Sequence, residues 1–276
     1  MRNINMSYYK VYYYCDIIDS LLYRFTGSID WASTGAQFTE LYFEDKVDDF
    51  PKHSALHNFC EFAINKLMLE DVEENIEEIQ LKYDKLNNLD KPQRLARAFN
   101  YDGRHPGRHL EIDDLFLMFD AEHETFFQYL LHNDFEFILD AYNDFISFDA
   151  DLDDIILQLS RELFYILFQN RDFLYRFNCY MSNGNRTNFH HCNIPLWVKR
   201  AVKFRDRGRC VCCGKDLSGL IDCEDENSVH YDHMVSLNEG GLNDVCNIQL
   251  LCRQCNLSKS SNSFTNTTYK DWYDFD

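Results

Sequence analysis

Apolar side chains before residue 181 recur at intervals of three and four residues, a spacing that places them on one face of an α-helix. The clearest windows are residues 14–25, 59–67, 127–145 and 156–166. Helix-breaking residues are sparse here, because neither glycine nor proline occurs in residues 52–91 or 108–183. With typical helices of about 11 residues or more, the pattern predicts an all-α bundle of about five to seven helices.

The pattern changes after residue 181. Residues 182–194 are polar and rich in turn-forming side chains, which is typical of a linker. An amphipathic pattern then covers residues 195–209 and starts at a proline, which the first turn of a helix accepts well. We therefore expect a mainly α chain with an acidic all-α domain over residues 1–181, the linker, a small domain over residues 195–263 and a tail over residues 264–276.

Charge is distributed unevenly between these parts. The 276 residues include 46 acidic and 27 basic side chains, a formal net charge of −19, and residues 1–195 contain 34 of the acidic and 17 of the basic ones. Overall charge therefore repels nucleic acid, and any such binding needs a local basic patch. We expect the acidic domain to regulate the chain or to dock a protein partner, although a solvated surface that serves only solubility explains its charge equally well.

A candidate basic patch lies on the predicted helix over residues 195–209. Four basic side chains share one face of this helix, while Trp197, Ala201 and Phe204 form another. We interpret the basic face as a phosphate contact, with a solvated surface as the alternative. The candidate nucleic-acid-binding residues are Lys199, Arg200, Lys203 and Arg207, with Lys259 as a further one.

Composition restricts the class of protein further. Hydrophobic residues make up 45% of the chain, which is enough for a buried core. No apolar run approaches the roughly 18 residues of a membrane helix, and the polar N-terminus lacks a secretory apolar region, so we expect a soluble, cytoplasmic protein without membrane contact. In that compartment, 11 cysteines indicate metal ligands or free thiols rather than disulfides.

Two cysteine pairs have the spacing of a zinc site. Cys210 and Cys213 form one Cys-x-x-Cys pair, and Cys252 and Cys255 form a second one. Tetrahedral Zn²⁺ takes four such sulfurs, so the pairs predict one structural zinc ion, with buried or free thiols as the alternative. Cys212 competes with its neighbours as a ligand, but only the pair 210 and 213 repeats the two-residue spacer. Cys223 and Cys246 have no partner at this spacing, and we expect both to be core thiols.

The segment between the two pairs carries a recognisable motif. It contains His230-Tyr-Asp-His233, Gly240-Gly241 and Asn247-Ile-Gln-Leu-Leu, and it continues through the second cysteine pair into Asn256. In this order the residues resemble the HNH endonuclease family of the ββα-metal superfamily, in its zinc-stapled form. The resemblance covers residues 195–262. One residue departs from the pattern, because Asn256 stands where the family often has histidine.

Residue chemistry and the resemblance together indicate roles in phosphodiester hydrolysis. His233 is the candidate general base, because imidazole titrates near neutral pH and accepts a proton from water. Asp232 and Asn256 offer oxygen ligands, which favour Mg²⁺ or Mn²⁺. Neighbouring strand residues point to opposite faces, and the resemblance implies a distorted hairpin that lets Asp232 and His233 both reach the phosphate. It also implies that Asn247 fixes the loop that orients His233.

The resemblance implies a metal-dependent endonuclease that acts on nucleic acid, with double-stranded DNA as the expected substrate and 5′-phosphate and 3′-hydroxyl ends as products. By the same resemblance, we expect an effector of bacterial antiphage defence. Two other functions stay open. One is a non-catalytic, zinc-stapled protein that binds nucleic acid or serves as a scaffold. The other is a toxin whose acidic half inhibits it or docks a partner.

Overall fold

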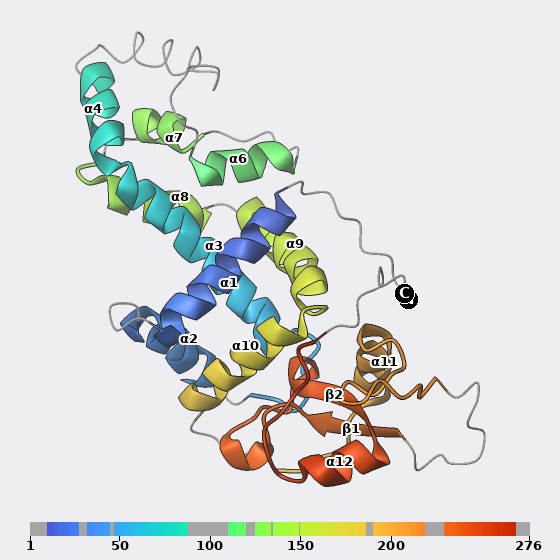
Figure 1. Cartoon of the computed structure of the whole chain (residues 1–276). Helices are drawn as coiled ribbons and strands as arrows, with labels where there is room; N and C mark the ends of the chain where they lie inside the picture. The colour runs from blue at the N-terminus through green and yellow to red at the C-terminus, as the bar shows by residue number, and fades with distance from the viewer. Residues whose placement is uncertain are drawn as a thin grey trace. The chain divides into compact units, whose positions relative to one another are not determined.

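The computed structural model describes residues 10–27, 32–44, 47–87, 110–119, 125–133, 135–148, 150–185, 190–218 and 229–268. The chain is mostly helical, with a small two-stranded sheet near its C-terminus, so the mainly α class is confirmed (Figure 1). It divides into two compact units. The first unit comprises the residues up to Val11 and Glu61–Glu162, and the second comprises Tyr12–Cys60 and Leu163–Asp276.

The first unit is an all-helical cluster held by aromatic packing and by helix caps. Phe126 packs against Tyr142 and Phe145 with ring centroids 5.5 Å away in each case. Carboxylates cap two helices, because Asp71 Oδ2 accepts the backbone N–H of Glu111 at 2.8 Å and Asp113 Oδ1 accepts that of Phe126 at 2.8 Å. Its helices are α4 (Ile76–Asn87), α6 (Glu111–Met118), α7 (Phe126–His132), α8 (Ile138–Phe148), and most of α3 (Ala55–Glu74) and α9 (Ala150–Leu167).

The second unit combines further helices with the sheet. Its helical core surrounds Phe59, which is fully buried and lies with its ring centroid 5.2 Å from that of Phe38 and 5.3 Å from that of Phe177. Each aromatic ring buries a large apolar area, so this cluster contributes much of the unit's hydrophobic stabilisation. Besides the ends of α3 and α9, the unit contains α1 (Val11–Gly27), α2 (Ala32–Glu44), α10 (Arg171–Gly184) and α11 (Leu196–Arg205).

More helices form than the sequence predicted. The described residues contain nine helices before residue 185, against about five to seven expected. Part of the excess comes from α6, which is too short to show an apolar period, and part from residues 127–145, a single periodic window in the sequence that forms both α7 and α8. A capping box at Thr125 and Gln128 starts α7 and satisfies backbone N–H groups that a short helix leaves free. None of the described helices combines the length and apolarity that crossing a membrane requires.

The C-terminal part forms a ββα arrangement. β1 (Val229–His233) pairs antiparallel with β2 (Ile248–Cys252), in a register that runs from Val229 opposite Cys252 to His233 opposite Ile248. α12 (Arg253–Lys259) follows β2 directly, and the connection between the strands contains the 3₁₀ turns η2 (Leu237–Glu239) and η3 (Val245–Asn247). Every residue of β2 is buried. The short hairpin therefore depends on packing from its neighbours.

α11 ends earlier than the sequence predicted. It stops at Arg205 rather than continuing to residue 209, because Arg207 and Gly208 both adopt left-handed backbone with φ of 56° and 64°. Gly208 N–H then closes the end with a 2.8 Å bond to the carbonyl of Lys203. The buried face consists of Val198, Val202 and Arg205.

One residue of the apolar face predicted for this helix lies in solvent. Phe204 is 54% exposed, although we placed it on the apolar face with Trp197 and Ala201. The buried face combines Val198 and Val202 with Arg205, whose charge has to stay close to a buried carboxylate. The stripe that meets the core is therefore the one next to Trp197, Ala201 and Phe204.

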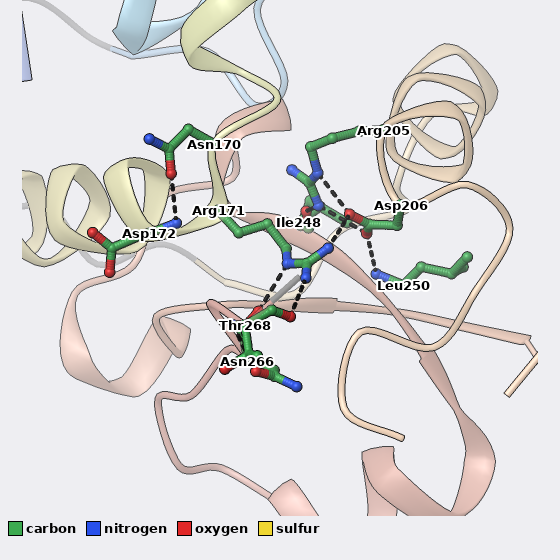
Figure 2. A network of polar contacts seen from close by, with 9 residues as sticks. All are labelled: Asn170, Arg171, Asp172, Arg205, Asp206, Ile248, Leu250, Asn266 and Thr268. Carbon is green, nitrogen blue, oxygen red and sulfur yellow. Dashed lines mark hydrogen bonds and ion pairs between the residues drawn. The ribbon is translucent and has the colours of Figure 1, made fainter. Parts of the chain in front are cut away.

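That carboxylate belongs to Asp206 (Figure 2). Asp206 is fully buried and accepts Nε and Nη2 of Arg205, each at 2.9 Å, and the backbone N–H of Leu250 at 3.0 Å. Arg205 Nη2 also donates to the carbonyl of Ile248 at 2.7 Å. α11 is thus joined to the middle of β2 by charged hydrogen bonds.

A second arginine extends this network to α10. Arg171 Nη1 lies 4.0 Å from Asp206 Oδ1, while its Nε and Nη2 donate to the carbonyls of Asn266 at 2.8 Å and Thr268 at 3.1 Å (Figure 2). Asn170 caps the same helix by accepting the N–H groups of Asp172 and Phe173. The start of α10 therefore holds the segment that follows α12.

The loop between α2 and α3 also contacts the ββα segment. Phe50 N–H donates to the carbonyl of Asn243 at 2.7 Å, and Ala55 N–H donates to Asp244 Oδ2 at 2.9 Å. Asn178 of α10 donates to the carbonyl of Cys246 at 3.0 Å. One compact unit therefore contains residues from both sides of the predicted linker 182–194. The domain boundaries themselves stay a prediction.

Replacing Asp206 tests the buried network. Asp206→Ala leaves the Arg205 guanidinium buried without its carboxylate, so we expect the free energy of unfolding to fall by about 3 to 5 kcal/mol. Asp172→Ala is the matched control, because Asp172 pairs with Arg176 at the surface and its loss should cost less than about 1 kcal/mol. Urea denaturation of both variants measures the difference, and equal losses would contradict the role given to Asp206.

Candidate functional site

Four cysteine sulfurs converge at the end of the hairpin. The Sγ atoms of Cys210, Cys213, Cys252 and Cys255 all lie within 4.8 Å of one another, and those of Cys213 and Cys252 are 3.8 Å apart. Sulfurs that share one tetrahedral ion with bonds of about 2.3 Å are separated by about this distance. The predicted ligand set therefore comes together, and it fits a structural zinc ion.

Local backbone geometry forms the two turns that present these sulfurs. After the first pair, Gly214 adopts a φ of 74° and its N–H donates to the carbonyl of Cys210 at 2.8 Å. Val211 N–H donates to the carbonyl of Leu250, which fixes this turn to β2. In the second turn, Cys252 ends β2 and its Sγ accepts the backbone N–H of Cys255 at 3.5 Å. The zinc site thus joins the loop after α11 to the start of α12.

The remaining cysteines of this region differ in position. Cys212 is half-buried and lies outside the group of four. Cys246 is fully buried, its Sγ lies 3.8 Å from the hydroxyl of Ser54, and burial raises its pKa well above the usual value. An uncharged core thiol is therefore the role that fits Cys246. Cys223 lies outside the described residues.

Asp232 forms an ion pair with α12. Its Oδ2 lies 2.7 Å from Nζ of Lys259, whose side chain is 2% exposed. Lys259 was a candidate for phosphate contact, and the structure places it against Asp232 rather than on the surface. A buried ammonium next to a carboxylate compensates the negative charge that this position would otherwise carry.

Asn256 faces a residue that the sequence analysis did not assign. Its Nδ2 lies 3.4 Å from Nδ1 of His230 on β1. His230 precedes Asp232 by two positions, and alternate residues of a strand share a face, so the period of β1 was the signal that could have identified it. With Nδ2 of Asn256 directed at His230, the amide oxygen is the atom of this side chain that could hold a cation.

His233 is buried on the hairpin. It is 6% exposed, and its Nε2 lies 2.9 Å from Oδ1 of Asn243. Burial lowers the pKa of His233; the charges of His191 and Lys259 act in the same direction, while the bond to Asn243 and the charge of Asp232 oppose it. The imidazole is therefore neutral at neutral pH and can accept a proton.

The hairpin is regular where the resemblance implied distortion. β1 and β2 stay paired through His233 opposite Ile248, and only then does Met234 N–H reach the carbonyl of Asn247 at 2.6 Å. The side chain of Asp232 contacts α12, whereas that of His233 contacts the loop between the strands. The two neighbours therefore make different contacts in a regular ladder.

Asn247 is at the centre of that loop. Its fully buried side chain accepts the N–H of Val235 at 2.9 Å and donates to the carbonyls of Val235 at 2.9 Å and Leu242 at 3.0 Å. Gly241 fits only because it lacks a side chain, since a Cβ there would lie 2.1 Å from the carbonyl oxygen of Val235. These contacts fix the loop that follows His233.

The basic residues predicted on α11 are partly exposed. Arg200 and Lys203 are exposed on the helix, and Arg207 is exposed on the turn after it. Lys199 is half-buried, with Nζ 5.9 Å from the ring centroid of Tyr231 on β1. One residue of the basic stripe, defined as Lys199, Arg200, Lys203 and Arg207, therefore lies near β1.

Zinc content tests the cysteine assignment. We expect one zinc ion per chain in elemental analysis. Cys255→Ser should lose this ion and should no longer show a cooperative unfolding transition, because structural zinc supplies folding free energy. Cys212→Ser is the matched control from the neighbouring turn and should keep the ion. Folded wild-type protein without zinc would contradict the assignment.

Comparison with known proteins agrees with this geometry. The model of the family described as HNH endonuclease matches residues 210–262. A search of curated proteins and a search of solved structures found no match to the chain. The match begins at the first cysteine ligand and contains both strands and α12. The C-terminal segment is thus similar to the HNH endonucleases, and its four clustered cysteines fit the zinc-stapled form of that family.

Proposed function

We propose that the chain is a metal-dependent endonuclease that hydrolyses phosphodiester bonds, with double-stranded DNA as substrate. The observation that carries the proposal is a buried histidine, neutral at neutral pH, directly beside a carboxylate on the same hairpin. The match of residues 210–262 to the HNH endonucleases supports a nuclease or nucleic-acid-binding role. Hydrolysis is favoured because His233 has the protonation state of a general base.

Oxygen donors on β1 and α12 suit a hard cation. Asp232 offers its carboxylate and Asn256 its amide oxygen, and both donor types prefer Mg²⁺ or Mn²⁺ to softer metals. A bound cation would supply charge neutralisation at the scissile phosphate. In the described structure Lys259 neutralises Asp232, so a cation has to compete with this ammonium. We therefore expect binding to need millimolar rather than trace metal.

The chain's own residues account for the remaining steps. His233 takes a proton from the attacking water, and the water oxygen forms the new bond to phosphorus. The bond between phosphorus and the 3′ oxygen breaks, which leaves a 5′-phosphate, and the 3′ oxygen takes up a proton from solvent to give a 3′-hydroxyl. Lys199 and its neighbours on the basic stripe hold the phosphates that flank the reacting one. A local stripe is needed for this, because the net charge of −19 repels DNA.

One observation favours a second function, a non-catalytic zinc-stapled protein that binds nucleic acid or serves as a scaffold. The Lys259 ammonium forms an ion pair with the Asp232 carboxylate at 2.7 Å, which is the arrangement expected of a site that holds no metal. The two functions differ in metal-dependent cleavage, which only the nuclease shows. For either one, we propose that the acidic helical part regulates the chain or docks a protein partner.

A role in antiphage defence is the cellular extension of the nuclease proposal. Bacteria that express the chain should then plate phage less efficiently than bacteria that express His233→Ala. Equal plating would remove defence from the proposal without affecting the chemistry.

Removing the general base should abolish most of the activity. His233→Ala is expected to lower the rate of plasmid cleavage in Mg²⁺ or Mn²⁺ by about 10² to 10⁴, because no other group then takes the proton from water. Asp232→Ala and Asn256→Ala should lower the rate and also raise the metal concentration that is needed. Gel assays of cleavage at several metal concentrations measure both effects.

The control for this experiment is His190→Ala. The side chain of His190 is exposed, and only its backbone carbonyl contacts the site, so alanine keeps the contact. Wild-type activity is expected. Full cleavage by His233→Ala would contradict the mechanism, whereas binding of DNA by the wild type without cleavage in any divalent metal would support the scaffold function.

Salt dependence tests the basic stripe. Each phosphate contact contributes about −0.9 to the slope of log K against log salt, so Lys203→Ala and Arg200→Ala should each weaken DNA binding and reduce the slope by about 1. Lys82→Ala is the control, because Lys82 pairs with Glu78 on α4. Fluorescence anisotropy at four salt concentrations gives the slopes. An unchanged slope in both stripe variants would show that the stripe is only a solvated face.

A further inference from the structure

A chain of hydrogen bonds leads from His233 out of the ββα segment. Oδ1 of Asn243 lies 2.9 Å from Nε2 of His233, and Nδ2 of the same amide donates to Oδ1 of Asp49 at 2.7 Å and to the carbonyl of His190 at 3.0 Å. Asn243 is 2% exposed, so water does not substitute for these partners. The sequence of donors and acceptors along this chain determines which ring nitrogen of His233 carries the hydrogen.

The amide of Asn243 has one possible orientation. Its nitrogen has two acceptors, the Asp49 carboxylate and the His190 carbonyl, which use both of its N–H groups. The oxygen therefore faces His233, and an amide oxygen only accepts. Nε2 of His233 must then carry the hydrogen, which leaves the lone pair on Nδ1.

Asp49 comes from the loop between α2 and α3, outside the residues that match the HNH family. Its neighbour Phe50 fixes this loop by donating its N–H to the carbonyl of Asn243 at 2.7 Å. Phe50 has a φ of 53°, a backbone conformation that non-glycine residues adopt only when the surroundings enforce it. The loop thus contacts both the side-chain amide and the backbone carbonyl of Asn243.

We propose that Asp49 is a positioning residue for His233 and acts through Asn243. It fixes the Nε2–H tautomer, so that Nδ1 takes the proton from the attacking water. Its charge also polarises the amide and strengthens the bond that steadies the imidazolium once the proton has moved. The inference rests on the proposed nuclease function and adds that a loop of the helical part completes the site.

The test uses the full chain with Asp49→Ala and the control Asp48→Ala, which removes a neighbouring exposed carboxylate. Asp49→Ala should lower kcat about tenfold and leave KM within about twofold, since the base is misplaced while the phosphate contacts stay. Asp49→Asn keeps an oxygen that accepts from Asn243, so it should recover most of the lost activity. Asp48→Ala should match the wild type.

A second measurement does not depend on activity. ¹⁵N NMR of the histidine rings in zinc-loaded protein, without added Mg²⁺ or Mn²⁺, should show the Nε2–H tautomer of His233 in the wild type, in Asp48→Ala and in Asp49→Asn. In Asp49→Ala and Asn243→Leu we expect a mixture of both tautomers. A merely structural role for Asp49 would change the melting temperature without changing the tautomer.

The outcomes are separable. Wild-type kcat and an unchanged tautomer in Asp49→Ala would overturn the positioning role, and so would the Nδ1–H tautomer in the wild type. Failure of the wild type to cleave DNA or RNA in Mg²⁺ or Mn²⁺ would remove the nuclease function, and the tautomer would then decide the positioning role alone. If Asp49→Ala does not fold, the tautomer in Asn243→Leu decides it.

Discussion

The site depends on a carboxylate that is completely removed from water. Asp244 accepts the N–H of Cys246 at 2.8 Å and that of Ala55 at 2.9 Å, so one side chain caps η3 in the hairpin connection and the first turn of α3. Burial raises its pKa, and the two backbone N–H groups oppose that shift because they bind the charged form. Losing either partner would leave a buried acceptor unsatisfied, which costs more than an average hydrogen bond contributes. This cost keeps the α2–α3 loop on the ββα segment.

Local spacing was enough to predict the four cysteine ligands of the zinc site. Two Cys-x-x-Cys pairs form turns whose geometry depends on the nearest four residues, and the four sulfurs meet as expected. The helical class followed for the same reason, because an apolar period of three to four residues is a local property. The short helix α6 contains too few turns to show that period, and the break between α7 and α8 interrupts a window that is continuous in the sequence pattern.

Contacts between residues that are distant in the sequence could not be predicted from local patterns. Asp49 and Asn243 are separated by 194 positions, and neither has a neighbour that marks it as part of a site. The burial of Arg205 was missed because arginine is usually exposed, and only the fold reveals the carboxylate of Asp206 that compensates its charge. The pairing of Lys259 with Asp232 was missed likewise, since a lysine near a nuclease motif suggests a phosphate contact.

The same charges set the conditions under which the site can work. Lys259 is nearly inaccessible, so its ammonium needs a negative partner, and Asp232 serves as that partner in the absence of a cation. A divalent cation that binds Asp232 leaves the group of cation, carboxylate and Lys259 ammonium with excess positive charge unless another anion enters. The phosphate of a nucleic acid is such an anion. Under the proposed nuclease function, cation and substrate should therefore favour each other's binding, because each compensates the charge that the other leaves unpaired. Lys259 would then contribute to substrate recognition from beneath the surface, without belonging to the basic stripe.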